Sequence, residues 1–206
     1  MQTTTYISID VATRSLAIGV YRMKPFVPMD SYKDANPVVM NDNLNGIITP
    51  ILMDVFDIND GAKTKETSAE AKAISLKRVL ERVDIDIAAS IVDQDIVVLI
   101  EYQMNSNYVS NSVFNMIVMF YAGRYPIEVI PPSWKNTICV HPLLSHSRFL
   151  GYCTSNYLAN KNHCKYSMIY LLTLTDHMDM IQSIRKKNHD DIADTLCQAL
   201  ARHLKQ

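Results

Sequence analysis

The stretch that decides the fold is Ile96-Val97-Val98-Leu99-Ile100-Glu101, near the middle of the chain. Its first five residues are apolar without interruption, which is typical of a strand that is buried on both faces. The run ends in Glu101, so a carboxylate is predicted at the end of a central strand. Such strands occur in α/β proteins, in which helices cover both faces of the sheet.

A second strand that ends in an acid lies near the N-terminus. Tyr6-Ile7-Ser8-Ile9-Asp10 predicts a short strand, and Leu16-Ala17-Ile18-Gly19-Val20-Tyr21 predicts its hairpin partner across a short polar link. A buried carboxylate at such a position needs a compensating group. If the first of these strands lies beside 96–100, the carboxylates of Asp10 and Glu101 meet at one edge of the sheet.

The other segments complete an alternation of strands and helices. Thr67 and Glu70 form a capping box, which predicts a helix from there to about Ile91. Further strands are predicted within 47–55 and at 127–130, further helices at about 110–122, 155–180 and after 189, and a short helix at 133–135. This order predicts an α/β fold with a mixed central sheet that is flanked by helices.

The C-terminal stretch His189-Asp190-Asp191-Ile192-Ala193-Asp194-Thr195-Leu196 adds three carboxylates within five residues. On a helix, Asp191 and Asp194 share one edge, whereas Ile192 and Leu196 face a different direction. Acids also favour the N-terminus of any helix, and that alone would explain them. Together with Asp10 and Glu101, however, they predict a cluster of carboxylates. Hard oxygen ligands suit Mg²⁺ or Mn²⁺, and two such ions can hold a phosphodiester for hydrolysis.

Composition narrows the class of protein. At 206 residues and 48% hydrophobic residues, the chain has material for one domain with a core. Because no apolar run approaches the length of a membrane span, we expect a soluble, intracellular protein with no membrane association. The four cysteines match no zinc or disulfide pattern. The net charge of −1 argues against a uniformly basic nucleic-acid binder but allows local basic patches.

These segments together resemble a known family. Ile9-Asp10, Leu99-Ile100-Glu101 and Asp191-Ile192-Ala193-Asp194 are similar to the RuvC-type Holliday-junction resolvases of the ribonuclease-H-like superfamily. The approach to the last helix, 186–191, resembles the branch from poxviruses and related large DNA viruses. Ala12 departs from the pattern, because many relatives have glycine there. The resemblance implies a single ribonuclease-H-like nuclease domain over residues 1–206, with insertions around 24–60 and 141–186.

The resemblance also implies roles for individual residues. The implied ligands of Mg²⁺ or Mn²⁺, with two ions in one site, are Asp10, Glu101, Asp191 and Asp194. Lys135 is implied to lie near the scissile phosphate as a further catalytic residue. Asp190 and His189 are candidate auxiliary residues, and Asp190 could replace or assist Asp191. The expected DNA-binding residues are Tyr102, Gln103, Asn105, Asn107, Lys161, Lys165, Lys186 and Lys187.

The activity implied is that of an endonuclease that binds branched DNA and cuts four-way (Holliday) junctions. By resemblance it acts as a homodimer, whose symmetric nicks leave 5′-phosphate and 3′-hydroxyl ends. Its implied setting is the resolution of recombination or viral replication intermediates, in a viral DNA replication compartment of the host cell. Two alternatives remain open from the sequence. One is a ribonuclease-H-like nuclease that acts on an RNA–DNA hybrid or a flap, and the other is an inert DNA-binding module on the same fold.

Overall fold

The computed structural model describes residues 3–12, 14–25, 46–63, 67–90, 95–102 and 108–205. These residues form a five-stranded sheet with the strand order β3-β2-β1-β4-β5. The strands are β1 (Thr4–Val11), β2 (Ser15–Met23), β3 (Ile48–Asp57), β4 (Asp95–Glu101) and β5 (Ile127–Ile130). β1, β2 and β3 pair antiparallel, whereas β1–β4 and β4–β5 are parallel. The mixed sheet predicted from the sequence is therefore confirmed.

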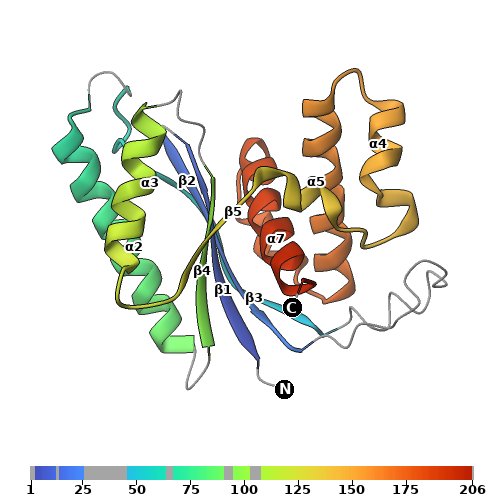
Figure 1. Ribbon diagram of the computed structural model, residues 1–206, viewed down its shortest axis with the longest axis horizontal. Coiled ribbons are helices and arrows are strands. Elements are labelled where there is room, and N and C mark those ends of the chain that lie inside the picture. The colour runs from blue at the N-terminus through green and yellow to red at the C-terminus, as the bar shows by residue number, and fades with distance from the viewer. Residues whose placement is uncertain are drawn as a thin grey trace.

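Helices cover both faces of this sheet (Figure 1). The α-helices are α2 (Ala69–Ser90), α3 (Tyr108–Tyr121), α4 (His146–Tyr152), α5 (Asn156–Leu174), α6 (Met178–Gln182) and α7 (His189–His203). The short 3-10 helices are η1 (Pro132–Thr137), η2 (Pro142–Leu144) and η3 (Lys186–Asn188). α2 and α3 pack on one face, and α7 packs on the other, with α5 outside it. No helix in the described ranges is both long and apolar enough to span a membrane.

The strand period decides which residues face which layer. Along β1, Ile7 and Ile9 belong to the core under α2 and α3, while Tyr6 belongs to the core under α7. Ser8 also faces α7, because its Oγ donates to the Gln198 side chain at 3.0 Å. Asp10 continues the same alternation, so its side chain lies on the α7 face. The sheet thus delivers this carboxylate to the C-terminal helix.

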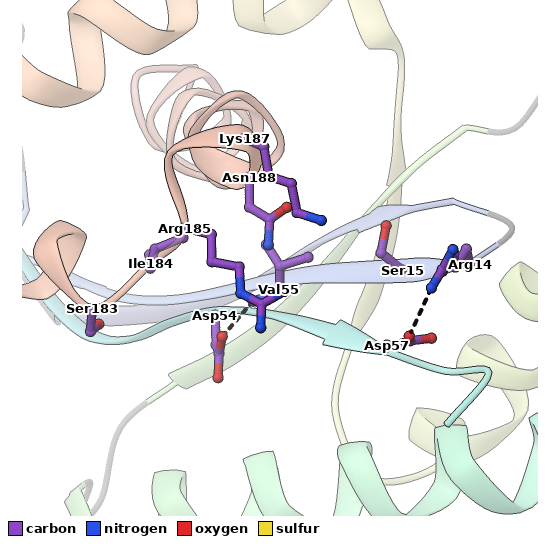
Figure 2. A pocket seen from close by; sticks show the side chains of 10 residues that line it. All are labelled: Arg14, Ser15, Asp54, Val55, Asp57, Ser183, Ile184, Arg185, Lys187 and Asn188. Carbon is purple, nitrogen blue, oxygen red and sulfur yellow. Dashed lines mark hydrogen bonds and ion pairs between the residues drawn. The ribbon is translucent and has the colours of Figure 1, made fainter. Parts of the chain in front are cut away.

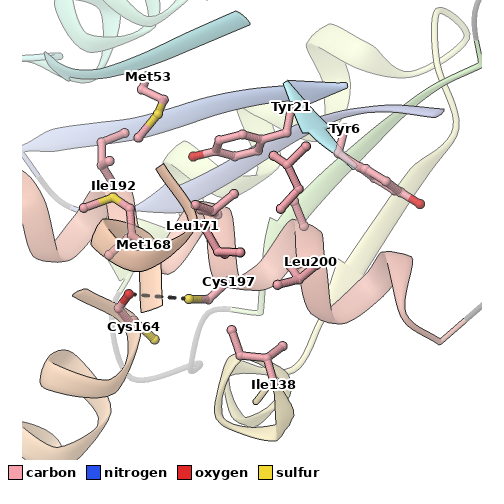
Figure 3. Close-up of a cluster of buried hydrophobic side chains, with 14 of the residues drawn as sticks. Tyr6, Tyr21, Met53, Ile138, Cys164, Met168, Leu171, Ile192, Cys197 and Leu200 are labelled. Atoms are coloured by element: carbon pink, nitrogen blue, oxygen red, sulfur yellow. Dashed lines mark hydrogen bonds between the residues drawn. The ribbon is translucent and has the colours of Figure 1, made fainter. Parts of the chain in front are cut away.

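The core between α7 and the sheet is the larger hydrophobic cluster (Figure 3). Ile192 and Leu196 of α7 are fully buried there, as the helical spacing predicted. Tyr21 lies in the same layer, and its hydroxyl is 2.8 Å from Oγ1 of Thr195. Gly19 makes room for that ring, because a Cβ at this position would overlap the Tyr21 side chain. A side chain at position 19 would therefore push Tyr21 away from α7.

Two boundaries differ from the sequence predictions. The Ser68 hydroxyl accepts a hydrogen bond from the Ala71 backbone amide at 3.1 Å, so Ser68 caps α2, and the capping box predicted at Thr67 is wrong. The helix predicted to run to about residue 180 is also wrong, because α5 ends at Leu174. Asp176 then adopts φ 56°, a left-handed conformation that no helix continues through.

Candidate active site

Two carboxylates meet at the carboxyl ends of β1 and β4. In the parallel ladder Ile9 pairs with Ile100, so the residues that follow, Asp10 and Glu101, lie side by side at the carboxyl ends of neighbouring strands, one residue before the end of β1 and at the end of β4. One further strand residue, Val11, separates Asp10 from the hairpin turn. Tyr102 donates its backbone amide to the Ile130 carbonyl, which keeps β4 in the sheet. The juxtaposition predicted from the strand ends is therefore present in the structure.

The first turns of α7 bring the second pair of acids to the same edge. Asp194 is 3% exposed, so its carboxylate lies inside the protein, whereas the Asp191 side chain is 38% exposed. Lys135 of η1 joins the two halves of the site. Its Nζ lies 2.7 Å from Oδ2 of Asp194 and 3.0 Å from Oε2 of Glu101. Strand and helix acids thus share one buried cation.

A second lysine enters the cluster from α5. Nζ of Lys161 lies 3.0 Å from Oδ2 of Asp194 and 3.4 Å from Oδ1 of Asp191. The sequence alone predicted a DNA contact for Lys161, because nothing local to α5 indicates that it faces α7. Lys161 also lines a 280 Å³ cavity beside Lys135 and Asp194. An ion pair with the acids is therefore compatible with a contact to DNA that enters this cavity.

The electrostatics of the site follow from crowding. Burial raises the pKa of Asp10 from 3.8 to about 7, and the nearby carboxylates of Glu101 and Asp194 act in the same direction. Lys135 and Lys161 lower it, but not enough to cancel the rise. Asp10 is therefore protonated in a substantial part of the metal-free molecules near neutral pH.

The two lysines are held in their charged form. Burial lowers the pKa of each ammonium, but the acids outweigh it and raise the pKa of both above the ordinary lysine value. For Lys135 the main opposing groups are Asp194 and Glu101, and for Lys161 the main one is Asp194. These ammonium groups are permanent parts of the site at any physiological pH.

Sequence reasoning missed two residues that support this cluster. Gln198, one turn after Asp194 on α7, donates its amide to Oε2 of Glu101 and accepts from Ser8. It fixes the strand acid against the helix. The ring of His163 contacts the backbone carbonyl of Lys135 at 3.2 Å and that of Leu144 at 2.8 Å, so it holds η1 in place. The i, i+4 spacing of Asp194 and Gln198 was a usable signal, whereas His163 gave none.

The donor set fits a divalent cation, although the side chains are not arranged as a finished metal site. Among the described residues, no three His, Cys, Asp or Glu side chains are close enough together to hold an ion. The ammonium groups of Lys135 and Lys161 lie between the carboxylates, and this keeps the carboxylates apart from one another. With all four carboxylates ionised, the two lysines would offset two of the negative charges, and the remaining two would match one divalent ion. In addition, Oδ1 of Asp194 is buried and has no hydrogen-bond partner among the described residues.

Several predicted residues lie outside the cluster. Oδ1 of Asp190 is 3.6 Å from Nζ of Lys165, in an outer ion pair that reaches neither Glu101 nor Asp194. Nε2 of His189 contacts the backbone carbonyl of Ile184 at 3.0 Å, which anchors the start of α7. The remaining predicted DNA-binding residues occupy three places. Tyr102 is half exposed, Lys186 and Lys187 belong to η3, and Gln103, Asn105 and Asn107 lie outside the described residues.

The sheet order, the strand-end acids and the acid-bearing last helix define a ribonuclease-H-like fold. No family model matches the sequence, and no curated protein matches it. Among solved structures, the chain is similar to fowlpox virus resolvase in complex with its substrate Holliday junction DNA. That match has a TM-score of 0.56 and 16% identity and covers 98% of this chain and 97% of that chain.

The fowlpox virus Holliday junction resolvase in a second crystal structure gives a TM-score of 0.55 at 16% identity, over 98% of this chain and 99% of that chain. Thermus thermophilus RuvC gives a TM-score of 0.56 at 15% identity, over 98% of this chain and 96% of that chain. The chain therefore has the ribonuclease-H-like fold in the form found in RuvC-type and poxvirus resolvases. The fold that the resemblance implied is therefore confirmed.

Proposed function

We propose that this protein is a metal-dependent endonuclease that cuts four-way DNA junctions. One observation carries the proposal. Three distant chain segments bring Asp10, Glu101 and Asp194 to one edge of the sheet, where Lys135 links two of them. Such an acid-rich edge suits a divalent cation that binds a phosphodiester. The solved structures similar to this chain include resolvases, one of them bound to Holliday junction DNA.

The residues of the cluster would divide the work as follows. Asp10, Glu101, Asp191 and Asp194 would hold Mg²⁺ or Mn²⁺, which when bound supplies Lewis-acid activation of water and charge for the leaving 3′ oxygen. Lys135 and Lys161 would attract the phosphate and offset its charge. Gln198 would keep Glu101 oriented. Because the lysines already offset two acids, a second ion would require one ammonium to move outward toward the DNA.

The test is cleavage of a synthetic four-way junction by the purified protein with Mg²⁺, with Mn²⁺ and with EDTA. We expect paired nicks that carry 5′-phosphates, in the presence of metal only. Asp194→Asn should abolish cutting and retain junction binding. Asp86→Asn is the matched control, because Asp86 lies on α2 beside Arg82, on the opposite face of the sheet. A folded protein that cuts no junction with either metal rules the proposal out.

Parallel substrates separate the alternatives. An RNA–DNA hybrid or a flap that is cut faster than the junction would assign the fold to another nuclease activity. Junction binding without cutting, together with no heat of metal binding in calorimetry, would indicate an inert binding module. Retention of all four acids around the buried Lys135 and the partly buried Lys161 favours catalysis over that module.

We also propose that the active form is a homodimer, because two copies related by a two-fold axis match the two-fold symmetry of a four-way junction. Light scattering coupled to gel filtration measures the mass directly. A mass equal to one chain of 23.4 kDa, both free and on the junction, would contradict this part of the proposal.

A further inference from the structure

A polar cavity lies near the acid cluster, because Asp10 pairs with Ala17 in the sheet and Ala17 pairs with Val55, which lines the cavity. It is lined by the β1–β2 hairpin, the end of β3 and the segment that precedes α7, and its volume is 530 Å³. Figure 2 shows Arg185 and Lys187 extending from that segment toward β3 and the hairpin, while Arg14 stands at the far end. We call this cavity the hairpin pocket. Its size falls in the range of ordinary ligand-binding pockets.

The charges in the hairpin pocket are unevenly matched. Arg14 lies 3.6 Å from Asp57, so its charge is shared with a neighbouring acid. Asp54 accepts a hydrogen bond from the Val55 backbone amide at 2.7 Å. Within the described part of the chain, neither Arg185 nor Lys187 has a side-chain hydrogen bond or an ion pair. Arg185 and Lys187 therefore line this concave polar surface without a partner among the residues that the structure describes.

The position of the hairpin pocket ties it to the candidate active site. Arg14 follows Asp10 by four residues, across a turn closed by the Ala12 amide and the Ser15 carbonyl at 3.1 Å. Lys187 precedes Asp191 by four residues, and η3 leads directly into α7. Two of the segments that carry the acids thus continue into the pocket. A DNA strand that places one phosphate at the acids would therefore place a neighbouring phosphate near the hairpin pocket.

We propose that the hairpin pocket binds a backbone phosphate of the DNA, one that flanks the phosphate to be cut. Arg185 and Lys187 would contact the non-bridging oxygens, and Arg14 would join them from the opposite end. This inference rests on the proposed nuclease function and adds a subsite that fixes where along the strand the cut falls. The pocket recognises phosphate and carries no information about base sequence.

The test measures binding of a fluorescent four-way junction by anisotropy in Ca²⁺, over a range of salt concentrations. Arg185→Gln should weaken binding roughly tenfold. The double variant with Lys187→Gln should also reduce the slope of log affinity against log salt by about 1 to 2. Arg82→Gln is the matched control, since Arg82 is an exposed arginine paired with Asp86 on the opposite face. The control should keep the wild-type slope.

A second measurement locates the phosphate. Single methylphosphonates, which remove one backbone charge, are placed in turn along the strands near the branch point. At the phosphate in the hairpin pocket, the substitution should weaken wild-type binding but not binding by Arg185→Gln. If every position weakens both proteins equally, or the double variant keeps the wild-type slope, the pocket is not a phosphate subsite even though the wild type cuts junctions. A wild type that neither binds nor cuts junctions overturns the nuclease proposal, and this inference with it.

Discussion

Replacing Asp10 with asparagine should stabilise the metal-free protein above pH 7 and have progressively less effect as the pH falls toward 4. The reason is the raised pKa of Asp10, about 7 in the folded protein against 3.8 as the ordinary value. Between these values the folded state binds a proton that the unfolded state does not. The contribution of Asp10 to stability is therefore fully present below pH 4 and is lost as the pH rises through 7.

The magnitude follows from the size of the shift. Each pKa unit corresponds to about 1.36 kcal/mol. The raised pKa of Asp10 therefore lowers the free energy of unfolding of the wild type by on the order of 4 kcal/mol between pH 4 and pH 8. Asparagine does not titrate, so the variant does not lose this stability as the pH rises. For a chain of this length the difference corresponds to roughly 8–16 °C in Tm. Circular dichroism melts in EDTA at several pH values measure it for the wild type, for Asp10→Asn and for the control Asp86→Asn.

The sign of the stability difference between Asp10→Asn and the wild type is the decisive result. If Asp10→Asn gains no stability relative to the wild type between pH 4 and pH 8, burial and the nearby carboxylates of Glu101 and Asp194 do not raise the pKa of Asp10. Saturating Mg²⁺ or Mn²⁺ gives a second check. Metal should stabilise the wild type more than the variant, because asparagine removes one proposed ligand.

Three further outcomes are expected from single substitutions. Lys135→Met should lower the unfolding free energy in EDTA by about 3–5 kcal/mol, measured by denaturant titration, because Glu101 and Asp194 lose their shared buried cation. Tyr157→Ala should raise KM for the junction roughly 5- to 100-fold, and Tyr157→Phe should restore it, because this 71% exposed ring lines the cavity over the acids and can stack on a base. Ser68→Ala should cost about 1 kcal/mol and lower Tm by about 2–4 °C in calorimetry, since α2 loses its cap.

Each of these has a clear contrary result. If Lys135→Met is as stable as the wild type, Glu101 and Asp194 are neutralised by protons when the lysine is absent. If Tyr157→Ala and Tyr157→Phe behave alike, the ring contributes no stacking. A Ser68→Ala protein with an unchanged Tm would show that the first turn of α2 is held by other contacts.

Much of the candidate site could be predicted from the sequence because its acids end regular elements. Asp10 and Glu101 close apolar strands, so the strand period and the end position were enough to place them at one sheet edge. Ile192 and Leu196 oriented α7, and that orientation carried Asp191 and Asp194 to the same edge. These inferences need only local pattern and the rule that parallel strands end together.

The remaining features depend on contacts between distant segments. Lys161 lies on α5, whose polar and apolar residues alternate without a clear face, so nothing in its neighbourhood shows that it pairs with α7. Gln198 is an uncharged residue in a buried position, and its role depends on Ser8, 190 positions away in the chain. The cap of α2 was misplaced by one residue because Thr67 and Ser68 are chemically equivalent candidates. Only the hydrogen bond distinguishes them.

The placement of α7 has a consequence for biosynthesis. This helix supplies Asp191 and Asp194, and it is translated after every strand of the sheet. A ribosome-bound chain that has completed β1 and β4 holds Asp10 and Glu101 but lacks the helix acids and Gln198. It also exposes the sheet face around Tyr6 and Tyr21 that α7 covers. The acid cluster can therefore form only after this last helix leaves the ribosome and docks, so a partly synthesised chain carries no complete metal-ligand set.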